Sequence, residues 1–411
     1  MQEFFEKCKQ AKTIVANLTS LQKNNVLLDM ANSLLDNTSK IINENKKDLK
    51  YAKDNDLSDS MLDRLLLDES RVQDMADSLK EIAALKEPVG RILEGWKSEQ
   101  DLKIQKISVP IGCIGIIYES RPNVTSDAAA LCFKSGNVSI LKGGKEANYS
   151  NNIIATLLQD VLVKHSLPEE IISLLPDNTR AGVEKLIKMD KYVDLIIPRG
   201  GESLIKYVSQ NATVSVVKHD KGLCHTYIDK TCDEQEAIKI AVNAKTQRTG
   251  VCNTTETLLV HTDIANKILP KLKAEFDKKN TELRGCQNTT KILDIKKANN
   301  EDFETEYLDN ILSIKVVDSL DDAIKHISKY GSGHSEAILS SNYSSIEQFL
   351  NEVDSACVYA NASTRFTDGA VFGFGAEVGI STNKLHSRGP MGINDLTTYK
   401  FKIYGDGQIR E

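Results

Sequence analysis

The stretch that decides the fold is VPIGCIGIIYESRPNVTSDAAALCFKSGNVSILKGG, residues 109–144. The apolar run CIGIIY (113–118) is followed by an amphipathic segment and then by a second apolar run, VSILK (138–142). Two short apolar runs that enclose a helical segment indicate parallel strands joined by a helical crossover. The same alternation continues with IISLL (171–175), VDLIIP (193–198) and VSVVK (214–218). The sequence therefore predicts a parallel sheet with helices on both faces.

A second α/β unit is predicted from Lys230 onward. Its helices are expected at 233–246 and 264–277, and its strands at 257–261, 313–317, 336–340 and 357–361. Because these helices and strands alternate as before, the second unit is also expected to hold a parallel sheet. The 411 residues exceed the size at which one hydrophobic core stops growing. The predicted fold class is therefore α/β, with two parallel-sheet domains.

The segments before and between these units have other patterns. Residues 3–85 show the three- and four-residue apolar spacing of helices, and Thr19 with Gln22 forms a capping-box pattern. Residues 93–110 and 396–404 alternate polar with apolar side chains, as exposed strands do. Exposed strands of this kind pair readily with another chain. We therefore expect them at a subunit interface of a homo-oligomer.

Composition and charge exclude several classes of protein. The formal net charge of −6 gives no basic field for a nucleic acid. The eight cysteines include no CxxC pair and do not cluster with histidine, so no metal site is expected. The N-terminus has no apolar run long enough for a signal peptide, and no segment reaches the about 18 apolar residues of a membrane span. We expect a cytoplasmic protein without a membrane partner.

Cys252 lies in NAKTQRTGVCNTTETLLVH (243–261), in a predicted turn between Gly250 and an apolar strand. A cysteine nucleophile needs access and a lowered pKa, which nearby cations and backbone N–H groups can supply. Lys245 and Arg248 are such cations. Taken alone, a free cysteine is more often a small buried hydrophobe. Cys252 becomes a candidate nucleophile through the motifs that surround it.

Candidate ligand-binding residues follow three of the predicted strands. Asn123 follows the first strand, Lys142 ends the second, and Gly200, Gly201 and Ser203 open a helix after another. Ligands of open α/β sheets bind at the carboxyl ends of the strands. The amide could donate to an oxyanion, the lysine could reach a ribose or phosphate, and the glycine turn could approach a phosphate. The structural alternatives are a helix cap, a solvated lysine and a tight turn.

A long glycine-rich loop at 359–392 carries two arginines, Arg365 and Arg388. Long loops of this composition usually carry function, because ordering them without a ligand or neighbour is entropically costly. Either arginine, or Arg121 after the first predicted strand, could bind a carboxylate or a phosphate.

In this order, the motifs resemble the aldehyde dehydrogenase superfamily, and specifically its γ-glutamyl phosphate reductase branch, over essentially the whole chain. The strings that carry the resemblance are YESRPNVT (118–125), LKGGKEA (141–147), GSGHSEAI (331–338), NASTRFTDG (361–369) and KLHSRGPMG (384–392). The resemblance implies a dinucleotide-binding domain of residues 1–92, 111–229 and 358–392, a cysteine-bearing catalytic domain of residues 230–357, and an oligomerisation ribbon of residues 93–110 and 393–411.

The resemblance also implies roles for residues. Cys252 matches the family's nucleophile, Asn123 matches an amide of its oxyanion hole, and Lys142, Gly200, Gly201 and Ser203 match its dinucleotide-binding region. It implies reduction of L-glutamyl 5-phosphate with NADPH in proline biosynthesis, through a thioester. A separate glutamate kinase would supply this labile substrate, with direct handover as a hypothesis.

One departure from the superfamily is informative. Hydrolytic members present a glutamate that activates water, but the corresponding stretch VKHDKGLCHTYID (217–229) has none. This favours exchange of the thioester with phosphate, and His225 in this stretch is expected to be structural. The nearest alternative is a hydrolytic or CoA-acylating aldehyde dehydrogenase. The alternative from another class is a silent oligomeric binding protein in which Cys252 is buried.

Overall fold

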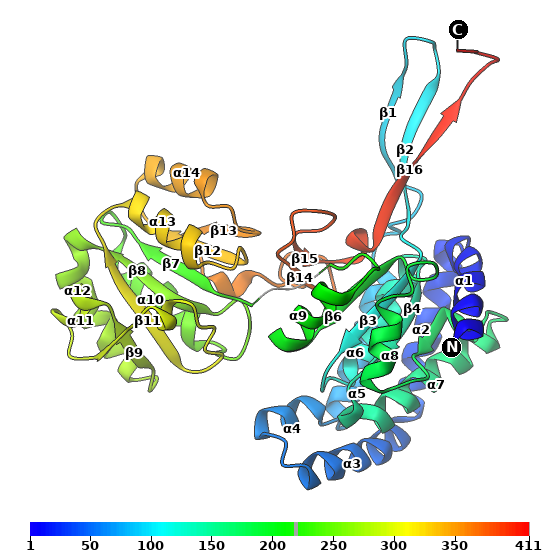
Figure 1. Ribbon diagram of the computed structural model, residues 1–411, viewed down its shortest axis with the longest axis horizontal. Coiled ribbons are helices and arrows are strands. Elements are labelled where there is room, and N and C mark those ends of the chain that lie inside the picture. Colours follow the sequence, from blue (N-terminus) through cyan, green and yellow to red (C-terminus); the bar gives the residue numbers. More distant parts are fainter. Residues whose placement is uncertain (218–220, 411) are drawn as a thin grey trace. The chain divides into compact units, whose positions relative to one another are not determined.

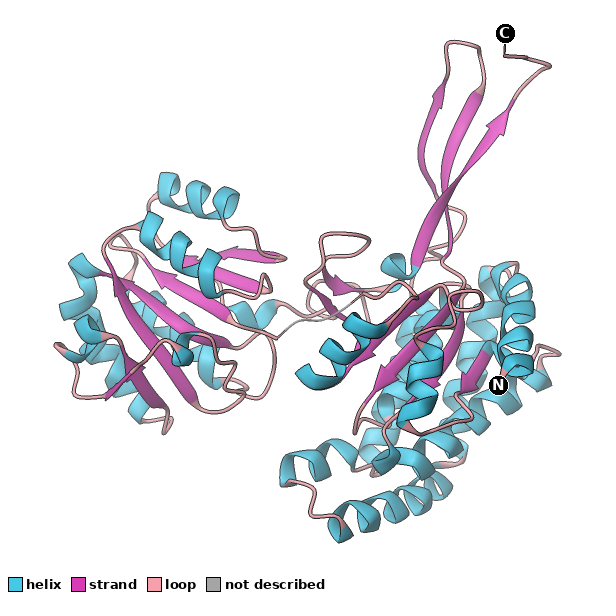
Figure 2. Cartoon of the chain, in the orientation of Figure 1, coloured by secondary structure: helices cyan, strands magenta, loops and turns pink. Residues whose placement is uncertain are grey.

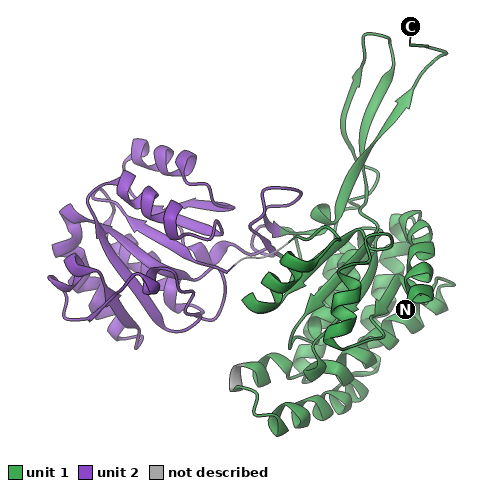
Figure 3. Ribbon diagram, in the orientation of Figure 1, with its two compact units in different colours: residues 1–218, 373–379, 391–411 green, residues 219–372, 380–390 purple. Residues whose placement is uncertain are grey.

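The structure is a computed structural model that describes residues 1–217 and 221–410. The chain folds into two compact units (Figure 3). Unit 1 consists of Met1–Lys218, Gly373–Gly379 and Met391–Glu411, and unit 2 consists of His219–Phe372 and Ile380–Pro390. Among the described residues, no helix has the length and apolarity needed to cross a membrane.

Unit 1 is built on a four-stranded parallel sheet (Figure 1). Its strands are β3 (Cys113–Tyr118), β4 (Val138–Lys142), β5 (Ile172–Leu174) and β6 (Leu195–Arg199), in the order β5-β4-β3-β6. Every residue of β3 is buried, which means that both faces of the sheet are covered, as predicted. The predicted strand at 214–218 needs correction.

In place of that strand, Val216 makes an isolated bridge to Ile196. Two backbone hydrogen bonds hold it, from Ile196 to Ser215 and from Val217 to Ile196, at 2.8 and 3.0 Å. Lys218 lies outside the described residues. The segment has the β-branched composition of a strand, but the chain passes into unit 2 directly after it, so the pairing stays short.

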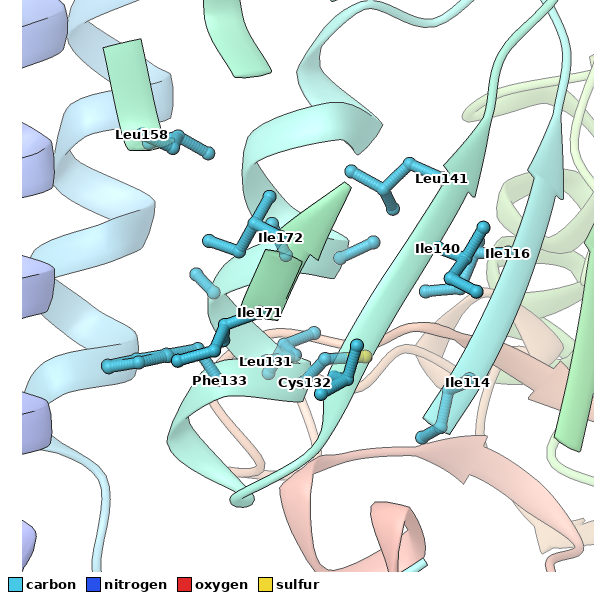
Figure 4. Packing of buried hydrophobic residues seen from close by; sticks show 14 of the residues in the cluster. Ile114, Ile116, Leu131, Cys132, Phe133, Ile140, Leu141, Leu158, Ile171 and Ile172 are labelled. Atoms are coloured by element: carbon cyan, nitrogen blue, oxygen red, sulfur yellow. The ribbon is translucent and has the colours of Figure 1, made fainter. Parts of the chain in front are cut away.

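Helices surround this sheet. They are α1 (Gln2–Ala16), α2 (Ser20–Asp36), α3 (Thr38–Asp54), α4 (Asp59–Leu65), α5 (Glu69–Ala84), α6 (Asn123–Lys134), α7 (Asn148–Lys164), α8 (Arg180–Leu186) and α9 (Glu202–Asn211). The predicted capping box is confirmed, since the Thr19 hydroxyl accepts from Gln22 N–H and the Gln22 side chain accepts from Thr19 N–H. Figure 4 shows Ile140 of β4 next to Ile116 of β3, and Leu131 and Phe133 of α6 belong to the same core cluster.

The strand order of unit 1 creates a switch point between β3 and β6. From β3 the chain moves outward through β4 and β5 and then returns to the other side of β3 as β6. Connections on the two sides of such a point leave in opposite directions, which opens a crevice at the carboxyl ends of the strands. The residues that follow β3 and β6 therefore lie at the edge of unit 1 where a ligand is expected.

Unit 2 contains a seven-stranded parallel sheet in the order β10-β9-β11-β8-β7-β12-β13. Its strands are β7 (Cys224–Ile228), β8 (Thr255–His261), β9 (Glu282–Gly285), β10 (Lys296–Lys297), β11 (Ile311–Val317), β12 (Ser335–Leu339) and β13 (Cys357–Ala360). Its helices are α10 (Glu234–Thr246), α11 (Thr262–Asp277), α12 (Gln287–Thr290), α13 (Leu320–Tyr330) and α14 (Tyr343–Glu352). The predicted second parallel-sheet unit is confirmed.

The domain boundaries expected at residues 229/230 and 357/358 need correction. Strand β7 pairs with both β8 and β12 in the middle of the unit 2 sheet, and β13 pairs with β12 at its edge. Residues 224–228 and 357–360 therefore belong to unit 2 because of their backbone pairing. The functional names of the two domains stay predictions.

A separate antiparallel sheet belongs to unit 1 (Figure 2). It consists of β1 (Ile92–Lys97), β2 (Lys103–Pro110) and β16 (Thr397–Tyr404), with β2 in the centre. Every residue of β1 is exposed, and so is every residue of β16 after the first. The predicted ribbon is confirmed as a structural element. A two-stranded pair, β14 (Gly379–Ser381) with β15 (Gly389–Met391), lies in the glycine-rich loop.

Candidate active site

Cys252 lies in the turn between α10 and β8, at the amino end of the unit 2 sheet, and is partly exposed. The start of β7 runs directly against its backbone. The buried Cys224 thiol donates to the Cys252 carbonyl oxygen at 3.1 Å. A Cβ atom on Gly222 would lie 1.8 Å from the same oxygen and 2.5 Å from Cys252 Cα. Only a glycine at position 222 leaves room for the cysteine where it stands.

The residue after the cysteine, Asn253, ties this turn to a second turn, the short 3-10 helix η4 (Thr364–Phe366). The Asn253 side-chain amide donates to the Thr367 carbonyl at 2.8 Å, and the Asn253 carbonyl accepts from the Thr364 hydroxyl at 2.7 Å. Arg365 lies in sequence between Thr364 and Thr367, the two residues that make these contacts. Its Nε donates to the Gln247 side chain at 2.9 Å, five positions before the cysteine.

Charges around Arg365 define an anion-stabilising environment. Burial lowers the pKa of the Arg365 guanidinium, the like charge of Arg248 lowers it further, and Cys252 acts in the opposite direction. Two guanidinium groups that repel each other beside a thiol stabilise a negative charge placed there, whether it is a thiolate or a phosphate. The structure therefore brings together two residues that the sequence singled out separately.

A buried ion pair joins the two elements that flank this turn. Lys245 Nζ, at the end of α10, lies 2.6 Å from Glu256 Oε2 on β8, and both side chains are fully buried. Glu256 Oε1 accepts a hydrogen bond from the Leu308 N–H at 3.3 Å. Burial raises the pKa of the Glu256 carboxyl to about 7, although Lys245 acts against this. The pair flanks the cysteine turn on both sides in sequence.

In unit 1, polar groups bond to one another at the switch point between β3 and β6. Glu119 N–H donates to the Arg199 carbonyl at 3.2 Å, and Gly201 N–H donates to the Glu119 carboxylate at 2.8 Å. Ser120 has a φ of 42°, which is strained for a side-chain-bearing residue. The Glu146 carboxylate holds it by accepting from its N–H at 2.6 Å and from its hydroxyl at 2.8 Å.

Asn123 is the first residue of α6 and is exposed. Its side-chain amide donates to the Asp127 carboxylate at 3.1 Å. The amide therefore has a fixed partner one turn further along the helix. The alternative role of capping this helix is not observed, because Pro122 is the N-cap residue.

The region expected to hold a dinucleotide contains a cavity of about 180 Å³ at the ends of β4 and β5. It is lined by Lys142, Gly143, Asn148, Asn151, Pro176 and Asn178, among others. Burial lowers the pKa of Lys142. The lysine and the amide side chains suit ribose hydroxyls and phosphate oxygens. At the start of α9, after β6, the Gly201 N–H donates to a carboxylate oxygen of Glu119, so this turn can bind an anionic oxygen.

The predicted substrate-binding arginines have different positions. Arg121 lies in unit 1 in the turn before α6, where its carbonyl accepts from Val124 N–H. Arg388 lies in unit 2 and is paired with the Asp354 carboxylate at 2.8 Å. Its guanidinium is thus already committed to an acid. Arg365 is joined to the cysteine turn through its hydrogen bond to Gln247.

Sequence reasoning missed several residues of this site. Gly222 contacts the Cys252 backbone, and its own N–H donates to the Glu306 carboxylate at 2.9 Å. His225, in contrast, was singled out as a structural residue, and it is fully buried and bonded to Glu336 at 3.0 Å. Gly222 and Glu306 are 84 positions apart in sequence, so no local pattern could have joined them.

Comparison with known proteins places the chain. The sequence model of the Aldehyde dehydrogenase family matches residues 22–289. A γ-glutamyl phosphate reductase of Nautilia profundicola is 64% identical over 411 residues, covering 100% of both chains. Another, of Nitratiruptor sp., is 65% identical over 412 residues with the same coverage. The chain belongs to the γ-glutamyl phosphate reductases of the aldehyde dehydrogenase family.

A solved structure agrees with this placement. The crystal structure of a γ-glutamyl phosphate reductase from Thermotoga maritima has a TM-score of 0.98 at 43% identity, covering 100% of this chain and 99% of that one. The aldehyde dehydrogenase match includes Asn123, Lys142 and Cys252 but ends before Arg365. The arginine turn thus lies beyond the segment that the wider family model recognises.

The close approach of Gly222 to Cys252 yields a prediction. We expect Gly222→Ala to lower the rate of Cys252 alkylation by iodoacetamide and the enzymatic kcat by about tenfold or more, because the added Cβ must displace the cysteine backbone. Gly250→Ala is the control, since a Cβ there meets only the Leu308 carbonyl, at 3.7 Å. Equal effects of the two substitutions would show that the contact with Cys252 is not what matters.

Proposed function

We propose that this protein reduces L-glutamyl 5-phosphate to L-glutamate 5-semialdehyde and phosphate, with NADPH, through a thioester on Cys252. The carrying observation is the partly exposed cysteine in a turn that Asn253 ties to the turn of Arg365. The family membership supports the choice of substrate, because the relatives matched over their full length are γ-glutamyl phosphate reductases. The reaction would be the second step of proline biosynthesis from glutamate.

The proposed acyl transfer uses the chain's own groups. The Cys252 thiolate attacks the acyl carbon, a carbon–sulfur bond forms, and the bond to the phosphate oxygen breaks with its electron pair leaving on phosphate. Arg365 and Arg248 stabilise the thiolate before the attack and the phosphate after it. The Asn123 amide is assigned as a donor to the oxyanion, together with backbone N–H groups.

NADPH, when bound, supplies the hydride that brings the acyl group to the aldehyde level. Lys142, Gly200, Gly201 and Ser203 are proposed to hold the cofactor, on the strength of the cavity beside Lys142 and the glycine turn at α9. Lys145, next to this cavity in sequence, is a second cation for a 2′-phosphate. The ratio of kcat/KM for NADPH and NADH tests the cofactor choice.

The test of the function runs the reaction backwards. NADP⁺ reduction is measured with glutamate 5-semialdehyde in the presence and absence of inorganic phosphate. The proposal expects turnover only with phosphate, because phosphate must release the acyl group from the cysteine. Turnover without phosphate would assign the chain to a hydrolytic activity, turnover only with CoA to an acylating one, and no turnover to a silent binding protein.

Arg365→Ala is expected to raise the KM for phosphate in this assay by about a hundredfold, because one of the two cations beside the cysteine is lost. Arg365→Lys should recover part of the loss, since a lysine keeps the charge but not the planar fork. Lys297→Ala removes one exposed cation of unit 2 and serves as the control. An unchanged KM for phosphate in Arg365→Ala would remove this residue from the anion site.

We also propose that the protein is a homo-oligomer joined through the β1/β2/β16 ribbon. Trp96, Tyr399, Phe401 and Ile403 are 44 to 59% exposed on its surface, and its edge strands leave backbone groups unpaired. Sedimentation velocity of the chain with and without residues 397–411 tests this. An association with a glutamate kinase is a separate hypothesis, and failure of the two proteins to co-sediment at working concentrations would exclude it.

A further inference from the structure

Asn123 has an acidic partner on its own helix. The two side chains are four positions apart on α6, so they lie on the same face, and Asn123 Nδ2 is 3.1 Å from Asp127 Oδ2. An exposed asparagine can present either its N–H₂ group or its carbonyl oxygen to a ligand. An ionised carboxylate only accepts hydrogen bonds, so it selects the orientation in which the N–H₂ group faces it.

Asp127 is held in an unusual environment for a carboxylate. Its Oδ1 atom is buried and has no hydrogen-bond partner of normal geometry among the described residues. Burial raises the pKa of Asp127 to about 6, although the Ser78 hydroxyl, the Asn123 amide and the charge of Arg199 all act to lower it. Ser78 faces the carboxyl from α5 and Arg199 faces it from β6.

We propose that Asp127 is a positioning residue that fixes the orientation of the Asn123 amide, and that protonation of Asp127 releases this orientation. The inference rests on the proposed function, which assigns Asn123 to the oxyanion. One N–H of the amide is bound by the carboxylate, and the second remains for the substrate. The protonated acid becomes a donor itself, so it can bind the amide carbonyl instead and allow the amide to turn over.

The consequence is a pH dependence that belongs to thioester formation and not to the thiol. Asp127 is ionised above its folded pKa of about 6, and the productive orientation is then held. As the pH falls through about 6, the acid takes up a proton and the rate of thioester formation should fall with it. The Cys252 thiolate also decreases at low pH, so the two contributions must be measured separately.

The experiment compares two rates on Cys252 between pH 5 and pH 8. The first is the rate of thioester formation from glutamate 5-semialdehyde and NADP⁺. It is monitored as the rapid formation of NADPH in the first catalytic cycle. The second is alkylation by iodoacetamide, which needs the thiolate but no oxyanion donor. The wild type should show a step near pH 6 in the ratio of the two rates.

Asp127→Asn should lower thioester formation about tenfold at pH 7.5 and remove the step, with alkylation unchanged. Asp160→Asn, an exposed acid on α7, is the matched control and should behave as the wild type. In the Asn123→Ala background, Asp127→Asn should add no further loss, because it acts only through the amide. Asn123→Ala alone should also lack the step, which keeps the test valid if Asp127→Asn does not fold.

Independent, multiplied losses in the double variant, or a step that persists without Asn123, would overturn the positioning role. A wild type that forms no thioester would instead overturn the proposed function. The two failures are thus distinguishable, since the first is read only in an enzyme whose wild type is active.

Discussion

Replacement of Cys252 by alanine is expected to abolish phosphate-dependent reduction of NADP⁺ by glutamate 5-semialdehyde, with a loss of at least about ten-thousand-fold in kcat. The alanine cannot form the thioester, so both the transfer to phosphate and the reverse attack on the acyl phosphate lose their nucleophile. The side chain is small and partly exposed, so its removal should leave the melting temperature almost unchanged. Steady-state kinetics and a thermal melt of the same preparation check both expectations.

Cys232→Ala is the matched control for this substitution. Cys232 is another partly exposed cysteine of unit 2, and burial raises the pKa of its thiol to about 11, so it is a poor nucleophile. Its alanine variant should keep wild-type turnover. A Cys252→Ala enzyme with appreciable phosphate-dependent turnover would contradict the covalent mechanism, whatever the control shows.

The second large effect concerns stability. Lys245→Met should lower the free energy of unfolding by about 3–5 kcal/mol, because it leaves the Glu256 carboxylate buried without its cation. The effect is expected to depend on pH. Without its cation, the buried Glu256 carboxyl has a higher pKa in the folded chain than in the unfolded chain. The free energy of unfolding therefore decreases as the pH rises above the pKa of Glu256 in the unfolded chain.

Urea unfolding of Lys245→Met at pH 5.5 and pH 8.5 measures this dependence, with the larger loss expected at pH 8.5. The double substitution Lys245→Met with Glu256→Leu should recover most of the stability, since it removes both charges and keeps the apolar volume. A single variant as stable as the wild type at both values would show that the pair is not coupled in the folded protein.

The sequence allowed the sheets of both units to be predicted, because their strands are short apolar runs bounded by polar turns. The central strands β3 and β8 are buried along their whole length, so their composition alone marks them. The segment 214–217 has the same composition but makes an isolated bridge to β6 in place of a strand. Its composition does not show that the chain enters unit 2 soon afterwards. Domain boundaries failed for a related reason, since the pairing of β7 is decided by strands far along the chain.

The candidate site shows the same limit. Cys252 and Arg365 were recognisable from local motifs, and the structure joined them through Asn253. Gly222 and Asp127 were not singled out, because a glycine in a loop and an acid on a helix have no local pattern that marks them. Their roles depend on what they touch, which is the Cys252 backbone in one case and the Asn123 amide in the other.

The central claim is a thioester on Cys252, and trapping it is the most direct test. The enzyme is mixed with glutamate 5-semialdehyde and NADP⁺ without phosphate, quenched in acid after a short interval, and examined by peptide mass spectrometry. We predict a glutamyl group on the peptide that contains Cys252, and its disappearance when phosphate is added before the quench. NADPH formation without an adduct on this peptide, or with an adduct on another cysteine, would contradict the proposal.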